Sequence, residues 1–162
     1  MSVTIPFQRD FDPIYGKAEQ VSPLIQRLVA KNPGAFTFTG TGTYIVGHQN
    51  VAVIDPGPDL ESHVSALLGA LKGRSVTHIL ATHTHLDHSP ASRALQATTG
   101  APIYAFGPHG TYRADSGDIV EEGADHEFKP DHRLKDGETV KGDDWTITAV
   151  HTPGHTSNHL CF

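Results

Sequence analysis

Apolar and polar residues alternate along much of the chain in short runs that are typical of β-strands, and turn-forming residues separate these runs. A first run covers residues 21–29, and a shorter one covers residues 36–39. Two further runs, residues 43–47 and 51–55, flank the turn-forming segment 48–50. The pattern predicts that the first third of the chain consists of strands.

After Asp59 the apolar residues recur at helical spacing, which predicts a helix that Asp59 caps and that runs to about Lys72. The residues at this spacing are Leu60, Val64, Leu67, Leu68 and Leu71. A strand over residues 77–82, a helix over residues 91–99 that ends at Gly100, and a strand over residues 102–105 complete this part. Strands that alternate with helices predict an α/β fold.

The remaining sequence is first polar and then β-like again. Residues 107–135 are rich in turn formers and predict a long surface loop, partly mobile. Residues 136–140 and 145–150 predict two strands, with Trp145 in the core, and residues 159–162 resemble the start of another strand, with Cys161 as a small core residue. Since no turn or polar tail follows, we expect the domain to be incomplete at its C-terminus.

Composition narrows the function classes. A length of 162 residues indicates one domain, residues 1–162, that is large enough to bury a core. Twelve basic and 18 acidic residues give a net charge of −6. This charge disfavours a protein that binds nucleic acid over its whole surface, but a local basic patch could still bind RNA. The sequence shows no secretory signal and no apolar stretch near the roughly 20 residues of a membrane span, so we expect a cytoplasmic protein without membrane contact.

The densest chemistry follows the strand predicted over residues 77–82. His83, His85, Asp87 and His88 form the pattern H-x-H-x-D-H, in a loop at the end of a buried strand. An extended backbone points residues i and i+2 to the same side, so His83 and His85 can bind one metal ion, while Asp87 and His88 can serve another. His155, on the turn after a later strand, is our candidate for a third imidazole.

The ligand types indicate the metal. With 12 His and one Cys, the chain has neither an internal disulfide nor a Cys-rich zinc site. Zinc accepts His nitrogen and Asp oxygen, so one or two zinc ions per site are expected, with iron or manganese as alternatives.

Three motifs in order carry a resemblance to a known family. Val53-Ile54-Asp55-Pro56-Gly57 precedes the H-x-H-x-D-H cluster, and His151-Thr152-Pro153-Gly154-His155-Thr156 follows it. Together they resemble the metallo-β-lactamase superfamily. The resemblance implies an αββα sandwich with a metal site at one edge, of which this chain carries the N-terminal half to two-thirds.

The same resemblance implies roles for individual residues. His83, His85 and His155 hold the first metal, and Asp87 and His88 contribute to the second, whose other ligands would lie beyond Phe162. Asp55 would support the metal loops, although its position equally suits the end of a strand. His151 and His159 would orient a neighbouring ligand or pack structurally, and we favour packing.

These features predict a hydrolase in which a metal-bound hydroxide attacks an ester, thioester or phosphodiester and Asp87 orients the nucleophile. His88 makes the chain similar to glyoxalase II and to lactamase-like endoribonucleases, so a small-molecule substrate is expected and RNA is the alternative. A third hypothesis is a non-catalytic metal-binding fragment of a longer hydrolase. An uncovered half-fold exposes strand edges, so we also expect a homo-oligomer or association with the missing C-terminal half.

Overall fold

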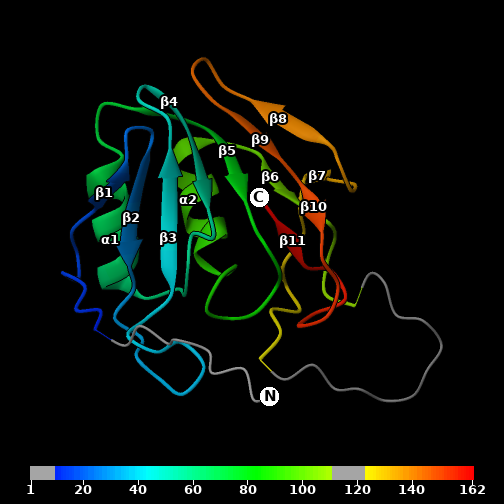
Figure 1. Ribbon diagram of the computed structural model, residues 1–162, viewed down its shortest axis with the longest axis horizontal. Helices are drawn as coiled ribbons and strands as arrows, with labels where there is room; N and C mark the ends of the chain where they lie inside the picture. Colours follow the sequence, from blue (N-terminus) through cyan, green and yellow to red (C-terminus); the bar gives the residue numbers. More distant parts are fainter. Residues whose placement is uncertain (1–9, 111–122) are drawn as a thin grey trace, which may run out of the picture.

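The computed structural model describes residues 10–110 and 123–162, and a seven-stranded mixed sheet forms its centre (Figure 1). The strand order follows the chain, with the first four strands antiparallel and the later ones parallel. The strands are β1 Glu19–Ser22, β2 Ile25–Val29, β3 Gly42–Val46, β4 Asn50–Ile54, β5 Ser75–Leu80, β6 Ile103–Ala105 and β7 His132–Arg133. Helices α1 (Glu61–Ala70) and α2 (Ala91–Thr99) connect β4 to β5 and β5 to β6, and Figure 1 shows both behind the sheet.

Each face of the sheet carries its own apolar core, because successive side chains of a strand point to opposite faces. In β4, Val51 and Val53 pack in the cluster that includes Leu67 of α1. Ala52, from the same strand, belongs to the opposite cluster with Trp145. The expected α/β architecture is therefore present, with helices on one face and short strands on the other.

The short strands of the second face come from the last part of the chain. Strands β8 (Thr139–Lys141) and β9 (Thr146–Thr148) form a hairpin, and β10 (Val150–His151) pairs with β11 (Leu160–Cys161). Trp145 is buried as predicted, and its indole N–H donates to the Asn50 carbonyl at 2.8 Å. The prediction for Cys161 is wrong: its thiol is exposed, because alternation in β11 turns Leu160 inward instead.

The sequence pattern predicts the bounds of α2 correctly but places the start of α1 too early. Helix α2 has the predicted bounds, and Gly100 ends it in the left-handed region with φ +74°, donating to the Gln96 carbonyl at 2.8 Å. Helix α1 begins later than predicted, with Leu60 at the N-cap and no side-chain cap. Asp59 is therefore not the cap, because the turn in which the Leu60 N–H donates to the Pro58 carbonyl comes first.

Two strand predictions need correction. Residues 21–29 form a hairpin, because Pro23 has no N–H to continue a ladder and the chain reverses between β1 and β2. The run over residues 36–39 is a turn in which the Phe38 carbonyl accepts a hydrogen bond from the Gly34 N–H at 3.1 Å. Phe36 is fully exposed and Phe38 adopts φ +54°, so apolar alternation there reflects surface aromatic residues.

The predicted loop over residues 107–135 is only partly described, since residues 111–122 lie outside the described residues. The described remainder is not a solvated loop. Phe128 is 1 % exposed within the helix-side core, and β7 adds a strand to the sheet. Among the described residues, neither helix has the length and apolar character needed to cross a membrane.

Candidate metal centre

The parallel strands β4 and β5 deliver the functional loops to one edge of the sheet. Asp55 directly follows β4, and the loop Thr82–His88 follows β5. The carboxyl ends of neighbouring parallel strands lie side by side, which is where open α/β sheets place their ligand sites. The β10–β11 connection reaches the same edge, because the Leu160 N–H donates to the Thr82 carbonyl at 2.7 Å.

Three histidines from two of these loops converge. His83, His85 and His155 each offer a ring nitrogen, and these atoms lie within 4.8 Å of one another. The ring centroids of His85 and His155 are 4.7 Å apart, and those of His83 and His155 are 5.0 Å apart. The structure thus brings together the three residues that the sequence assigns to the first metal.

A hydrogen-bond relay fixes the tautomer of His83. The Thr82 hydroxyl donates to Asp55 Oδ2 at 2.8 Å, so its oxygen accepts from His83 Nδ1–H at 2.9 Å. The lone pair of His83 then lies on Nε2, which is buried and has no hydrogen-bond partner among the described residues. A buried nitrogen left free in this way, beside two further imidazoles, fits the three-His ligand set of a catalytic zinc site.

The electrostatics keep His83 neutral. Burial, followed by the charges of His88, His85 and His155, holds the pKa of His83 far below its ordinary value. A neutral imidazole is the form that binds a metal, so the site does not have to release a proton from His83.

Asp87 and His88 lie beside the three histidines and bind each other. His88 Nε2 is 3.1 Å from Asp87 Oδ2, and the His83 and His88 ring centroids are 4.2 Å apart. Although burial raises the pKa of Asp87, hydrogen bonds from His88 and Thr41 and the charge of His88 hold it below its ordinary range. Asp87 therefore carries its negative charge at neutral pH.

His88 is held between two carboxylates. Its Nδ1 is 2.9 Å from Asp55 Oδ2, on the side opposite Asp87. Burial lowers the pKa of His88, but hydrogen bonds and charge from Asp55 and Asp87 outweigh it and raise the pKa to about 10. A metal at His88 Nε2 would replace a proton, while the Asp55 contact keeps the ring oriented.

Asp55 holds the two ends of the Thr82–His88 loop, and the sequence resemblance implies a supporting role of this kind. The Asp55 residue is 5 % exposed, and its carboxylate accepts hydrogen bonds from the Thr82 N–H at 2.7 Å, the Thr82 hydroxyl and His88. The backbone of Asp55 adopts φ +50°, a conformation uncommon for a residue with a side chain.

The two remaining candidates differ in position. His151 packs against Phe106, with ring centroids 4.1 Å apart and planes at 7°, in line with the packing role we favoured. His159 lies nearer the site, with its ring centroid 5.2 Å from that of His83 and its Nδ1 2.8 Å from the Thr152 hydroxyl. Burial, followed by the charge of His155, lowers the pKa of His159.

Sequence reasoning missed the polar residues that hold these loops from behind. The hydroxyl of Thr41, the last residue before β3, donates to Asp87 Oδ2 at 2.9 Å. Asn158 is 1 % exposed, and its amide donates to the Thr84 hydroxyl at 3.1 Å and the Gly107 carbonyl at 3.2 Å. Neither residue belongs to a recognisable spacing, because each reaches its partner only through the tertiary fold.

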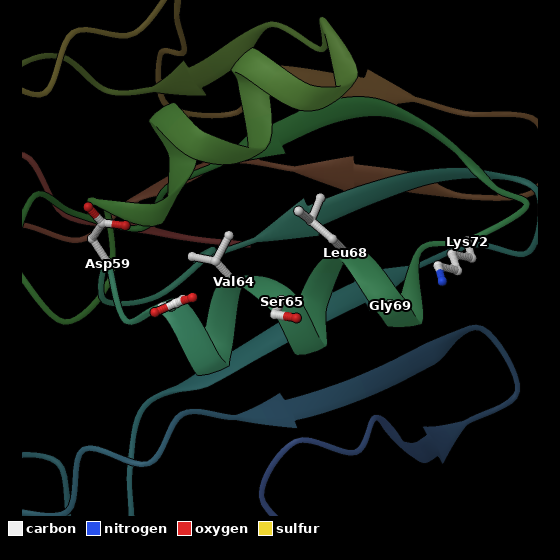
Figure 2. Close-up of a pocket in the computed structure, with 7 residues that line it drawn as sticks. Asp59, Val64, Ser65, Leu68, Gly69 and Lys72 are labelled. Atoms are coloured by element: carbon white, nitrogen blue, oxygen red, sulfur yellow. The ribbon is translucent and has the colours of Figure 1, made fainter.

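A separate hollow lies along the outer face of α1 (Figure 2). Its lining comes from one segment: Asp59, Glu61, Val64, Ser65, Leu68, Gly69 and Lys72. This set contains no histidine or cysteine and no residue of the metal loops, so the hollow is not part of the candidate metal centre.

Comparison with known proteins supports the same family from sequence. The family model of the metallo-beta-lactamase superfamily matches residues 37–162. An atrochrysone carboxyl ACP thioesterase of Cryptosporiopsis sp. is 36 % identical over 153 residues, covering 89 % of this chain and 41 % of the relative. A protein of the same description from Aspergillus terreus is 31 % identical over 162 residues, covering 98 % of this chain and 45 % of the relative. The chain thus spans less than half the length of these relatives.

Solved structures agree on the fold. A metallo-beta-lactamase of Cronobacter sakazakii superposes with a TM-score of 0.69 at 20 % identity, covering 91 % of this chain and 58 % of that structure. The subclass B3 enzyme BJP-1 of Bradyrhizobium japonicum gives a TM-score of 0.63 at 22 % identity, covering 88 % of this chain and 54 % of that structure. The predicted metallo-β-lactamase-like fold, represented by its N-terminal part, is therefore confirmed.

Proposed function

Because this chain belongs to the metallo-beta-lactamase superfamily, we propose that it carries the metal centre of a zinc-dependent hydrolase that cleaves thioesters. The observation that carries the proposal is the convergence of His83, His85 and His155 ring nitrogens within 4.8 Å, with His83 Nε2 buried and free of hydrogen-bond partners among the described residues. The thioester class is supported by relatives described as acyl carrier protein thioesterases. Since the chain spans less than half of them, the activity is proposed for the whole protein.

In this proposal His83, His85 and His155 hold the first metal, and Asp87 and His88 belong to a second position. Zinc bound there would act as a Lewis acid on the scissile carbonyl and would lower the pKa of a coordinated water to about 7. Iron or manganese would suit the same ligands. Among the described residues no further histidine or carboxylate joins the three-His group within ligand spacing, so we expect one tightly held ion per chain.

The surrounding side chains would prepare the site for hydrolysis. Asp87 stays ionised beside the trio and can accept a hydrogen bond from an attacking water, which orients its lone pair. Thr41 and His88 hold Asp87 by its Oδ2, which restricts the rotation of the carboxylate. Attack on the thioester carbonyl breaks the carbon–sulfur bond and releases an acid and a thiol.

The proposal is tested with zinc-loaded protein and the benzoyl thioester of N-acetylcysteamine, by following release of the N-acetylcysteamine thiol with a chromogenic disulfide. The same preparation is offered a fluorescent RNA oligonucleotide, and His83→Ala is the matched control. We expect zinc-dependent thioester hydrolysis that His83→Ala abolishes. RNA cleavage without thioester cleavage would contradict the proposal in favour of an endoribonuclease. Zinc binding with neither reaction would favour a non-catalytic metal-binding fragment.

A further inference from the structure

The backbone around His85 is hydrogen-bonded to residues 123–125, a segment that is distant in sequence. The Leu86 N–H donates to the Gly123 carbonyl at 2.8 Å, and the Asp125 N–H donates to the Thr84 carbonyl at 2.7 Å. His85 and Ala124 form an isolated antiparallel bridge between these two bonds. Residues 123–125 therefore fix the peptide groups on both sides of one proposed metal ligand.

The side chain of Asp125 connects residues 123–125 to helix α2. The Asp125 residue is 3 % exposed, and its Oδ2 accepts hydrogen bonds from Arg93 Nη1 at 2.7 Å and the Ser89 hydroxyl at 3.0 Å. Oδ1 accepts the Glu127 N–H at 3.2 Å, which closes a local turn. A buried carboxylate with donors on both oxygens is held rigidly, because moving it would leave a buried charge unpaired.

Ser89 connects Asp125 to His85 a second time. The Ser89 hydroxyl lies 3.0 Å from Asp125 Oδ2 and 3.3 Å from the His85 carbonyl. The backbone N–H groups of His88 and Ser89 also donate to that carbonyl, at 3.0 and 3.1 Å. The Ser89 hydroxyl has one proton and donates it to Asp125 Oδ2, so Ser89 joins Asp125 to the turn whose N–H groups bind the His85 carbonyl. The peptide groups on either side of His85 are bonded directly to Gly123 and Asp125.

We propose that Asp125 is a positioning residue for the metal centre: with Ser89 and Arg93 it fixes the backbone of His85, so that the His85 ring is presented to the metal without further ordering. The inference rests on the proposed function, since it concerns the metal that His85 would bind. A ligand held in place before the metal arrives loses less conformational freedom on binding, so removing the clamp weakens affinity.

The test uses the whole chain with cobalt(II) as a spectroscopic probe for zinc, and three variants. Asp125→Asn keeps the side-chain volume but removes the charge, and Ser89→Ala removes only the hydroxyl. Asp131→Asn is the control: Asp131 also joins α2 to the sheet, accepting hydrogen bonds from Gln96 at 2.6 Å and the Ile103 N–H at 2.8 Å. Among the described residues, Asp131 makes no hydrogen bond to the 82–88 loop.

Affinity is measured by competition with a chelator, and the ligand field by the visible absorption of bound cobalt. Amide hydrogen exchange of Leu86 in chelator measures how firmly its N–H is held by the Gly123 carbonyl when no metal is bound. We expect Asp125→Asn to weaken cobalt binding about ten- to hundredfold, to alter the spectrum and to speed exchange at Leu86. Ser89→Ala should do the same more weakly, and Asp131→Asn should match the unmodified chain.

Cobalt affinity and spectrum unchanged in Asp125→Asn, or weakened equally in Asp131→Asn, would overturn the positioning role while leaving the metal site intact. An unmodified chain that binds no cobalt would overturn both the metal centre and the clamp. If circular dichroism shows that Asp125→Asn does not fold, Ser89→Ala decides: weaker binding supports the inference, and unchanged binding and exchange contradict it.

Discussion

The contacts of Asp55 make a quantitative prediction for the variant Asp55→Asn. The buried carboxylate accepts three hydrogen bonds, two from Thr82 and one from His88, at 2.7 to 2.9 Å. Asparagine keeps the shape but offers one oxygen, and its NH₂ group faces a donor. At least one buried donor therefore loses its partner.

The magnitude follows from the cost of such a loss. An unsatisfied buried donor costs about 1–3 kcal/mol, and hydrogen bonds to a charged group lie at the upper end. We therefore expect Asp55→Asn to lower the free energy of unfolding by about 2–4 kcal/mol. Thr82→Val removes the hydroxyl that donates to Asp55 and accepts from His83 Nδ1–H, and it leaves the other two hydrogen bonds of Asp55 in place. It should cost about 1–3 kcal/mol, mostly because the His83 donor loses its partner.

Urea denaturation at pH 7 in chelator, followed by circular dichroism, measures both variants without a contribution from metal binding. A loss below about 0.5 kcal/mol for Asp55→Asn, the range of ordinary surface substitutions, would refute the reasoning that this carboxylate holds the Thr82–His88 loop. A larger loss for Thr82→Val than for Asp55→Asn would refute it as well, because the hydroxyl would then stabilise the fold mainly through His83 and not through Asp55.

Three further predictions concern neighbouring residues. The pKa of His88 is raised from 6.5 to about 10, so its contribution to stability is complete below pH 6.5 and is lost as the pH rises towards 10. In chelator, the free energy of unfolding of the unmodified chain should therefore fall by roughly 2–4 kcal/mol more than that of His88→Gln between pH 6.5 and 10. Parallel pH profiles of the two chains in urea denaturation would exclude this. Gly57→Ala should destabilise the fold by about 1–3 kcal/mol, because Gly57 has φ +95° and a Cβ there would lie 2.6 Å from His63 Nε2; an unchanged Tm would contradict the close approach. Thr41→Val removes a hydrogen bond to Asp87, so the pKa of the Asp87 carboxyl should rise in a carbon-13 NMR titration, and a constant pKa would show that this bond is not formed in solution.

The sequence predicted the elements whose side chains pack against the sheet. The spacing after Pro90 and the left-handed Gly100 define α2 correctly, since amphipathic pattern and C-cap agree. The pattern failed at Phe36 and Phe38, where apolar side chains lie on the surface, and at Phe128, where one aromatic residue in a polar stretch enters the core. Alternation in sequence does not reveal whether another element comes close enough to bury the residues.

The same limit applies to the candidate site. The ligand candidates could be identified from sequence because His83, His85, Asp87 and His88 lie on one loop with metal-ligand spacing. Asp125, by contrast, acts on this loop from about 40 residues away, and nothing in its local sequence distinguishes it from a surface carboxylate. Hydrogen bonds of this kind depend on how two segments meet, and that is a property of the fold.

The most direct test of the central claim is the zinc content of the purified chain. Elemental analysis after dialysis against zinc should give one equivalent per chain, and His83→Ala should retain far less, because the convergence of His83, His85 and His155 would be broken. An unmodified chain without zinc, or a His83→Ala variant with its zinc content unchanged, would contradict the assignment of this site.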